Sequence, residues 1–231
     1  MEITTILFDL DGVLIDPLAS ISSSLNHALA SLGRPPRPSE ALRGLIGPPL
    51  EQSAHVLLDS DDPDLIDRFI TAYRARYALI CERESAPAPG LCESLEALSG
   101  RLRGRMAVAT HKPERFARMI LEALAVARFF SAICGGDERR RGDTKAAIIG
   151  RALASLGVGP AGAVMVGDRS FDVLGAAAHG IPTIGVLAGM GSRAELEAAG
   201  ARWFIEDLRG LPALIEALSA EPKPPTAGRA G

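Results

Sequence analysis

Six polar side chains that could take part in catalysis or metal binding follow, or lie close to, the ends of short apolar segments. They are Asp9, Asp11, Thr110, Lys145, Asp168 and Asp172. Carboxylates that lie close together repel one another unless a cation neutralises them or one takes a proton, so several aspartates at one place predict a bound cation. A site with few ligands, all of them oxygen atoms, suits Mg²⁺, which favours phosphate-bearing partners. These residue types therefore predict a Mg²⁺ site that acts on a phosphoryl group.

Lys145 and Thr110 fit the same chemistry, because an ammonium and a hydroxyl can both donate to phosphoryl oxygens. One carboxylate could attack phosphorus and carry the phosphoryl group covalently. A second acid could protonate the leaving oxygen and later activate water. The residues alone do not decide which of Asp9 and Asp11 is the nucleophile.

The apolar segments that must position these side chains read as buried strands. Residues 3–8 (ITTILF) are short, apolar and β-branched, as in a strand covered on both faces. Beyond residue 90, strands alternate with helices, and the expected strands are residues 105–110, 131–136, 161–168, 182–187 and 201–205. This alternation predicts an α/β fold with a doubly wound, mainly parallel sheet. Ligands bind at the carboxyl ends of such strands, so the polar side chains should meet there.

Residues 17–85 have a different character. LASISSSLNHALASLG (18–33) and PDLIDRFITAYRARYALI (63–80) have helical spacing of apolar residues, and no segment between them reads as a strand. We therefore expect an α/β core domain formed by residues 1–16 and 86–219, interrupted by an all-helical cap domain at 17–85. Residues 220–231 are rich in Pro and Gly, which predicts a disordered tail.

The composition excludes several classes of protein. The chain has 231 residues with a net charge of −3 and 4% aromatic residues, which argues against a nucleic-acid partner. It contains no uninterrupted apolar run of about 18 residues and no basic amino-terminal leader, so we expect neither a membrane partner nor secretion. Cys81, Cys92 and Cys134 lack metal-ligand spacing and read as free thiols. A cytoplasmic protein, monomeric or homodimeric, is expected.

Four motifs together resemble a known family. FDLDGVL (8–14), VAT (108–110), Lys145 and VGDRSFD (166–172) are similar to the signature motifs of the haloacid dehalogenase superfamily of aspartyl-phosphate-forming phosphohydrolases. The resemblance extends over nearly the whole chain except the tail. It implies a haloacid dehalogenase-like Rossmannoid core with the helical cap inserted after the first motif, and a Mg²⁺-dependent phosphatase.

The resemblance also assigns roles to the acids. It implies that Asp9 is the nucleophile and Asp11 the general acid/base. Asp168 would bind Mg²⁺ together with the Asp9 carboxylate and the Asp11 backbone carbonyl, and Asp172 would support the waters of the metal. A dehalogenase is disfavoured, because Asp11 provides acid/base chemistry for a phosphoester.

The phosphate-binding and substrate-binding residues follow in the same way. The resemblance implies that Thr110 and Lys145 bind the phosphoryl group. His111 directly follows Thr110 and could face the substrate. Arg43, in the predicted helix before GLIGPP, is a cap-side candidate for gripping a substrate carboxylate or second phosphate through a bidentate fork.

Three further stretches narrow the expected substrate. GLIGPPLEQS (44–53), ATHKPERFA (109–117) and GVLAGMGSRAELEAAGA (185–201) are similar to phosphoglycolate phosphatase-like proteins, which implies 2-phosphoglycolate as the best single substrate. The chain departs from that pattern by having Pro17 in place of Ser, His111 in place of Asn or Ser, and Met190 in place of Tyr.

Other functions stay open at this point. A nucleoside monophosphate (as for a 5'-nucleotidase) or pyrophosphate could be the substrate, or a sugar hydroxyl could accept the phosphoryl group, as in a phosphomutase. A phospho-accepting receiver domain also uses acids, a Thr and a Lys, but lacks both the DxDG pattern and a helical insert. A lid over the site favours a small phosphorylated metabolite as the partner.

Overall fold

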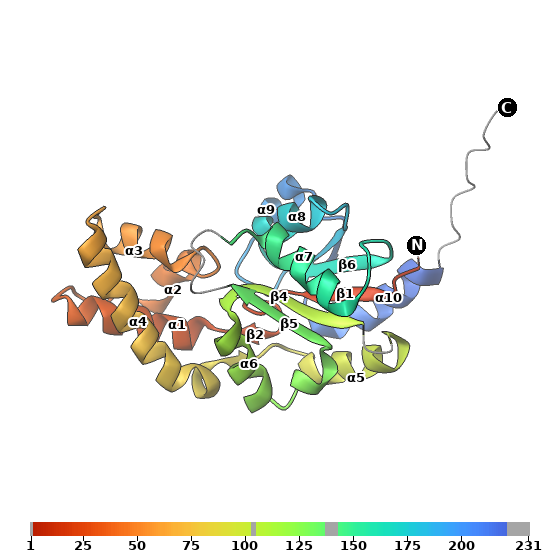
Figure 1. The fold of residues 1–231 in the computed structure, drawn as a ribbon, viewed down its shortest axis with the longest axis horizontal. Helices are drawn as coiled ribbons and strands as arrows, with labels where there is room; N and C mark the ends of the chain where they lie inside the picture. The colour runs from red at the N-terminus through yellow and green to blue at the C-terminus, as the bar shows by residue number, and fades with distance from the viewer. Residues whose placement is uncertain (1, 103–104, 137–142, 221–231) are drawn as a thin grey trace.

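The computed structural model describes residues 2–102, 105–136 and 143–220. Within them, parallel strands form a six-stranded sheet in the order β5–β4–β1–β6–β7–β8 (Figure 1). The strands are β1 Thr5–Phe8, β4 Met106–Pro113, β5 Ala132–Gly136, β6 Ala163–Gly167, β7 Thr183–Val186 and β8 Trp203–Ile205. The predicted strands are confirmed, and β1 lies between β4 and β6, where the strand order reverses.

Helices cover both faces of the sheet, which makes the fold doubly wound. One face packs against α5 Leu91–Leu102, α6 Glu114–Ala123 and α10 Leu211–Ala220, and the other against α7 Lys145–Leu156 and α8 Ser170–Ala177. Successive residues of β1 separate accordingly, because Ile6 and Phe8 join one hydrophobic cluster and Leu7 joins the other. The short helix α9 Arg193–Ala199 packs on α8.

The cap is an all-helical insert that extends from one end of the sheet (Figure 1). Its helices are α1 Leu18–Ser31, α2 Ser39–Leu42, α3 Leu50–Leu58 and α4 Pro63–Glu84, with a 3₁₀ turn at Arg43–Leu45. Polar contacts join it to the core. Lys112 of β4 donates to the Tyr77 hydroxyl of α4 at 2.6 Å, and Arg169 donates to the Ile46 carbonyl, also at 2.6 Å.

The two connections between cap and core run side by side. Ile15–Asp16 (β2) and Ala86–Pro87 (β3) pair as a short antiparallel ribbon, so the chain leaves the core and returns to it at one place. The sequence did not predict these two-residue strands. Ala220 closes α10, and residues 221–231 of the predicted tail lie outside the described residues. Among the described residues, no helix combines the length and apolar character needed to cross a membrane.

Candidate active site

A tight loop after β1 carries the first two aspartates. The amide of Asp9 donates to the Val166 carbonyl at 2.9 Å, which continues the pairing of β1 with β6. The backbone then reverses, and the amides of Val13, Leu14 and Ile15 all point at the Leu10 carbonyl. Gly12, with φ of +81°, makes this reversal possible. A β-carbon there would lie 2.1 Å from Asp168 Oδ2, so only glycine lets this loop and Asp168 approach so closely.

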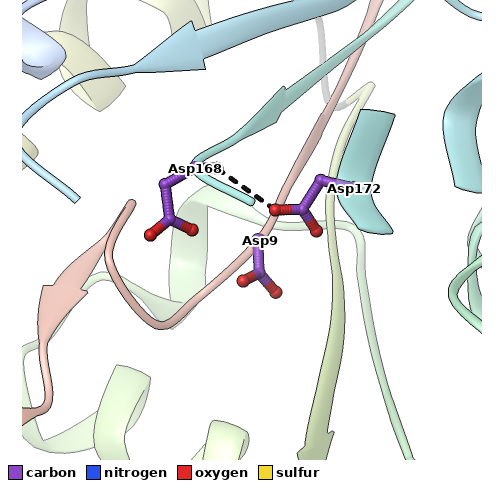
Figure 2. A group of neighbouring side chains, drawn as sticks. All are labelled: Asp9, Asp168 and Asp172. Atoms are coloured by element: carbon purple, nitrogen blue, oxygen red, sulfur yellow. Dashed lines mark hydrogen bonds between the residues drawn. The ribbon is translucent and has the colours of Figure 1, made fainter. Parts of the chain in front are cut away.

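Three buried carboxylates meet at the carboxyl edge of the sheet (Figure 2). They belong to Asp9 after β1, Asp168 after β6 and Asp172 in the first turn of α8, and one oxygen from each lies within 4.8 Å of the others. Asp172 Oδ2 accepts from the backbone amides of Asp168 and Arg169, each at 3.1 Å. Asp168 Oδ2 accepts from the Met190 amide at 2.6 Å. The backbone therefore holds two of the acids in fixed orientations.

Lys145 supplies a positive charge to this cluster. Its Nζ atom lies 2.7 Å from Asp9 Oδ1 and 2.7 Å from Asp172 Oδ1. Thr144 caps helix α7 by accepting from the Ala147 amide, so Lys145 is the first residue of that helix. Burial alone would lower the pKa of Lys145, but the Asp172 and Asp9 carboxylates raise it above its ordinary value. The ammonium therefore stays charged between the two acids.

One ammonium does not balance three carboxylates. Burial, followed by the charges of Asp172 and Asp9, raises the pKa of Asp168 well above its ordinary value. Burial also raises the pKa of Asp172 to about 6, against the opposing effect of Lys145. Asp168 Oδ1 is buried and has no hydrogen-bond partner among the described residues. An oxygen-only cluster with excess negative charge and an unpartnered oxygen fits a bound Mg²⁺.

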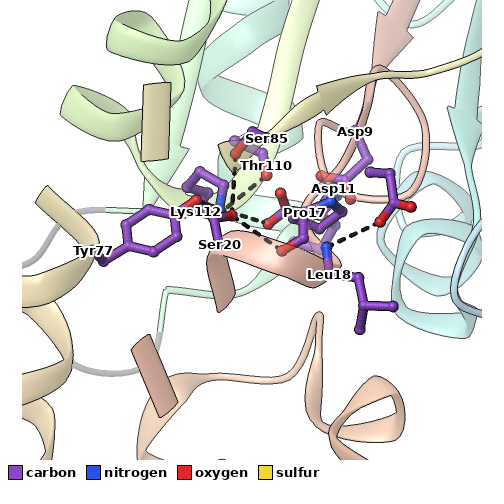
Figure 3. A network of polar contacts seen from close by, with 11 residues as sticks. Asp9, Asp11, Pro17, Leu18, Ser20, Tyr77, Ser85, Thr110 and Lys112 are labelled. Carbon is purple, nitrogen blue, oxygen red and sulfur yellow. Dashed lines mark hydrogen bonds and ion pairs between the residues drawn. The ribbon is translucent and has the colours of Figure 1, made fainter. Parts of the chain in front are cut away.

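Asp11 forms an ion pair with a second lysine, Lys112, which was not predicted from the sequence. Lys112 Nζ lies 2.9 Å from Asp11 Oδ2 and donates to the Tyr77 hydroxyl of the cap (Figure 3). Burial raises the pKa of Asp11 above its ordinary value, although Lys112 opposes this shift. Lys112 follows Thr110 by two residues in β4, and nothing in that spacing indicates its partners.

The two other residues predicted near the phosphate lie on β4. Thr110 is buried, and its hydroxyl accepts from the Lys112 amide at 3.2 Å. The His111 ring lies 5.3 Å from that of Phe171, between ring centres, and its Nδ1 has no hydrogen-bond partner in the described part of the chain. Burial, with the nearby charge of Lys145, lowers the pKa of His111 to about 4. His111 is therefore neutral at pH 7.

A cavity of about 440 Å³ lies between the core and the cap. Asp9, Asp11, Thr110 and His111 contribute to its core side. Its apolar and aromatic lining includes Ile21, Leu25, Ile46, Tyr73, Phe116 and Phe171. Lys145, Asp168 and Asp172 do not themselves line this space but contact or adjoin Asp9, which does.

Arg43 is not among the described residues that line the cavity. Its Nε lies 3.2 Å from Glu40 Oε2, and its Nη1 lies 3.6 Å from the Met190 sulfur. The structure therefore brings the other predicted site residues to one region, and it places Arg43 at the edge, paired with an exposed glutamate of the same helical segment.

Comparisons with known proteins give a consistent picture. The sequence model of the family described as haloacid dehalogenase-like hydrolase matches residues 6–186. A 5'-nucleotidase of Pseudomonas aeruginosa is 37% identical over 211 residues, which are 91% of this chain and 95% of that protein. A phosphoglycolate phosphatase of Caulobacter vibrioides is 35% identical over 232 residues, 96% of this chain and 95% of that protein.

A solved structure has the same overall fold. The crystal structure of a predicted phosphatase from Clostridium acetobutylicum superposes with a TM-score of 0.86 at 31% identity. The match covers 94% of this chain and 100% of that one, so it includes both the sheet and the helical cap.

Proposed function

This chain belongs to the haloacid dehalogenase-like hydrolase family and is an enzyme of its phosphatase type, and on that premise we propose how its site works. We propose a Mg²⁺-dependent phosphatase that hydrolyses a small phosphomonoester through an aspartyl-phosphate on Asp9. The observation that carries the proposal is the buried cluster of Asp9, Asp168 and Asp172, with Lys145 between two of its members. A buried group of like charges has a high energetic cost that a role in catalysis explains.

Asp9, Asp168 and the backbone carbonyl of Asp11 would hold the Mg²⁺. Asp172 would contribute less directly, because one of its oxygens accepts two backbone amides and the other contacts Lys145. When bound, the metal would neutralise charge on the phosphoryl oxygens and on the attacking carboxylate.

The residues of the chain carry the bond changes. An Asp9 oxygen attacks phosphorus as the bond from phosphorus to the leaving oxygen breaks, and Asp11 gives its proton to that oxygen. Asp11 then takes a proton from water as the water oxygen attacks the aspartyl-phosphate, which releases inorganic phosphate and restores Asp9. The raised pKa of Asp11 supports its role as an acid, because a carboxyl must be protonated to begin the first step.

Thr110 and Lys145 would bind the phosphoryl oxygens during both steps. Thr110 is buried beside Asp9 at the cavity surface, and the Lys145 ammonium already contacts the nucleophile. Groups fixed in this way stabilise developing charge without reorganising at the moment of reaction.

The cap would act as a lid over the reaction. We propose that residues 17–85 move as a unit on the β2–β3 ribbon, opening for exchange of substrate and product and closing to exclude bulk water. The cap side chains Ile21, Leu25 and Tyr73 line the same cavity as Asp9 and Asp11.

The names of the similar enzymes point to two substrate classes, nucleotides and 2-phosphoglycolate, and the size of the cavity favours the larger of these. A space of about 440 Å³ falls within the range of about 300–1,000 Å³ typical of sites for drug-sized ligands. A two-carbon acid such as 2-phosphoglycolate would fill little of it. Tyr73, Phe116 and Phe171 contribute aromatic atoms to the cavity lining, and such an apolar surface suits a nucleotide base better than a two-carbon acid. We therefore propose nucleoside 5'-monophosphates as the preferred substrates, with 2-phosphoglycolate as the second candidate.

A panel of phosphomonoesters tests the reaction and the substrate together. Phosphate release is measured with and without Mg²⁺ for 2-phosphoglycolate, nucleoside 5'-monophosphates, pyrophosphate and a sugar bisphosphate. The expected result is Mg²⁺-dependent release with the highest kcat/KM for a nucleotide. A higher kcat/KM for 2-phosphoglycolate would refute the argument from cavity size, and isomerised sugar without free phosphate would indicate a phosphomutase.

The nucleophile needs its own test. Acid quenching of the enzyme with ³²P-labelled substrate should trap label on the wild-type protein and none on Asp9→Asn, which should lack turnover. Asp64→Asn, an exposed position on α4, is the matched control and should behave as wild type. Substantial activity in Asp9→Asn would refute the proposed mechanism.

A cytoplasmic location, a monomeric or homodimeric state and the lack of nucleic-acid partners stay predictions from the sequence.

A further inference from the structure

Lys112 is a buried charge to which the proposed mechanism gives no role. It is 8% exposed, and its ammonium contacts Asp11 Oδ2 at 2.9 Å and the Tyr77 hydroxyl at 2.6 Å. The same ammonium lies 4.6 Å from the centre of the Tyr77 ring. A lysine held by three such contacts has lost most of its conformational freedom, and that cost argues for a specific use.

The pairing with Lys112 makes the two oxygens of Asp11 unequal. Oδ2 contacts the ammonium, whereas Oδ1 is buried without a hydrogen-bond partner among the described residues. Asp11 also lines the cavity. Lys112 therefore fixes the rotation of the carboxyl group and leaves Oδ1 without a competing hydrogen-bond partner among the described residues. A general acid must present its proton to the leaving oxygen within hydrogen-bond reach, so this orientation matters for the first step.

Tyr77 connects the cap to the ion pair of Lys112 and Asp11. It lies on α4, is almost fully buried, and meets Phe116 of the core at a ring-centre distance of 5.0 Å in an edge-to-face contact. Its hydroxyl accepts a hydrogen bond from Lys112, so a side chain of the cap contacts a lysine of the core (Figure 3). If the cap moved away, the Lys112 ammonium would lose this acceptor and part of its shielding from water.

We propose that Lys112 is a positioning residue that aims the Asp11 carboxyl at the leaving oxygen, and that Tyr77 of the cap holds Lys112 in place for this task. The inference rests on the proposed function of Asp9 and Asp11. It assigns Lys112 neither to the phosphoryl group nor to the metal. The acid would thus be fully aligned only when the cap lies on the core as in this structure.

The dependence of kcat/KM on the leaving group distinguishes a positioning role for Lys112 from a role in phosphate binding, Mg²⁺ binding or folding. An alkyl alcohol is a poor leaving group and needs a proton from Asp11, whereas p-nitrophenolate leaves readily without one. A defect in positioning Asp11 should therefore lower kcat/KM strongly for an alkyl phosphate and only slightly for p-nitrophenyl phosphate. A defect in phosphate binding, in Mg²⁺ binding or in folding would lower both.

The test uses Lys112→Met, which keeps most of the apolar stem, and Tyr77→Phe, which removes only the hydroxyl. The alkyl substrate is adenosine 5'-monophosphate or 2-phosphoglycolate, whichever the wild type hydrolyses faster. For Lys112→Met, kcat/KM should fall by about 10–10²-fold with the alkyl substrate and by less than about 5-fold with p-nitrophenyl phosphate. The ratio of kcat/KM for the alkyl substrate to kcat/KM for p-nitrophenyl phosphate should therefore fall in Lys112→Met, and in Tyr77→Phe this ratio should fall by about 3–10-fold. Arg68→Met, at an exposed position of α4, is the control for loss of a cation.

Equal losses with both substrates, or an unchanged ratio in both variants, would overturn the inference. Circular dichroism and thermal unfolding establish that each variant is folded, and Tyr77→Phe keeps the test decisive if Lys112→Met does not fold. Failure of the proposed function looks different, because the wild type would then form no phosphoenzyme from p-nitrophenyl phosphate. A wild type that forms it, with an unchanged ratio in the variants, would refute the role of Lys112 alone.

Discussion

Lys145 and Asp9, which are 136 positions apart in the chain, form an ion pair with 2.7 Å between Nζ and Oδ1. Both side chains are buried, and the same ammonium also contacts Asp172. The loop after β1 and the start of α7 are therefore held together at the point where the nucleophile is proposed. Removing the ammonium would leave its two carboxylate partners facing each other across the same space.

Lys145→Met should therefore affect both stability and catalysis. Without Mg²⁺, the free energy of unfolding should fall by about 3 kcal/mol, because buried carboxylates lose their partner. Activity should fall by about 10²–10³-fold through loss of a donor to the phosphoryl oxygens. Urea unfolding and steady-state kinetics measure the two effects, with Arg68→Met as the exposed control. An active Lys145→Met enzyme would contradict the role proposed for this ammonium.

Asp168→Asn should separate stability from metal binding. Burial and the neighbouring acids raise the pKa of Asp168, so its ionised form destabilises the metal-free fold at pH 7. The neutral amide can still accept from the Met190 amide and should raise the metal-free free energy of unfolding by about 1–2 kcal/mol.

The increase in melting temperature that Mg²⁺ causes in the wild type should disappear in Asp168→Asn, since a ligand stabilises only a fold that binds it. Thermal unfolding with and without Mg²⁺ measures both effects, and Asp64→Asn is the matched control. Equal stabilisation of Asp168→Asn and wild type by Mg²⁺ would place the metal elsewhere.

Most of the fold follows from local patterns in the sequence. The run at 3–8 predicts β1 because β-branched apolar residues suit a strand covered on both faces, and Leu7 and Phe8 are indeed fully buried. The alternation after residue 90 predicts the parallel sheet in the same way. The β2–β3 ribbon was missed, because two-residue strands are too short to have a periodicity.

The topology of the sheet accounts for the predicted site residues that follow strands directly. Asp9 and Asp168 come immediately after β1 and β6, so the topology alone brings them to one edge. Lys112 could not be found in this way, because its partner Tyr77 lies 35 positions away on a cap helix. The helical spacing of apolar residues in 63–80 fits a buried Tyr77, but it does not indicate that the hydroxyl contacts an ammonium. Arg43 was expected near the substrate, yet helical spacing also places it beside Glu40, and this local pair is the one observed.

Gly12→Ala should disrupt the site more than it disrupts the fold. Gly12 has a φ of +81°, and a β-carbon there would lie 2.1 Å from Asp168 Oδ2. Gly157→Ala is the matched control, because φ is +65° there but no atom lies within 4 Å of the added carbon. Both should lose about 1–2 kcal/mol of stability from backbone strain.

The difference between the two glycine variants lies in the contact with Asp168. Only Gly12→Ala should also lose activity, by about 10²-fold, and weaken the stabilisation by Mg²⁺. Kinetics and urea unfolding of the two variants separate the clash from the strain. Equal activities in the two variants would show that Asp168 adjusts to the added carbon without consequence.

The lowered pKa of His111 predicts that the folded protein loses stability as the pH falls below about 6.5. Burial and the charge of Lys145 lower its pKa to about 4, although Asp9 and Asp143 oppose the shift. The unfolded chain has an ordinary histidine pKa of about 6.5, so between these values the unfolded state binds more protons than the folded one. The stabilising contribution is therefore fully present above about pH 6.5 and is lost as the pH falls toward 4.

His111→Asn removes this titration, so the free energy of unfolding should decrease less in the variant than in the wild type between pH 7 and pH 5. The difference should be about 1–2 kcal/mol, as a shift of this size gives. Urea unfolding at the two pH values measures it, and the exposed His27→Asn variant controls for a histidine substitution remote from the cavity. Acid destabilisation shared by all carboxylates cancels in the comparison, so equal losses in His111→Asn and wild type would mean that His111 is protonated as easily in the folded protein as in the unfolded chain.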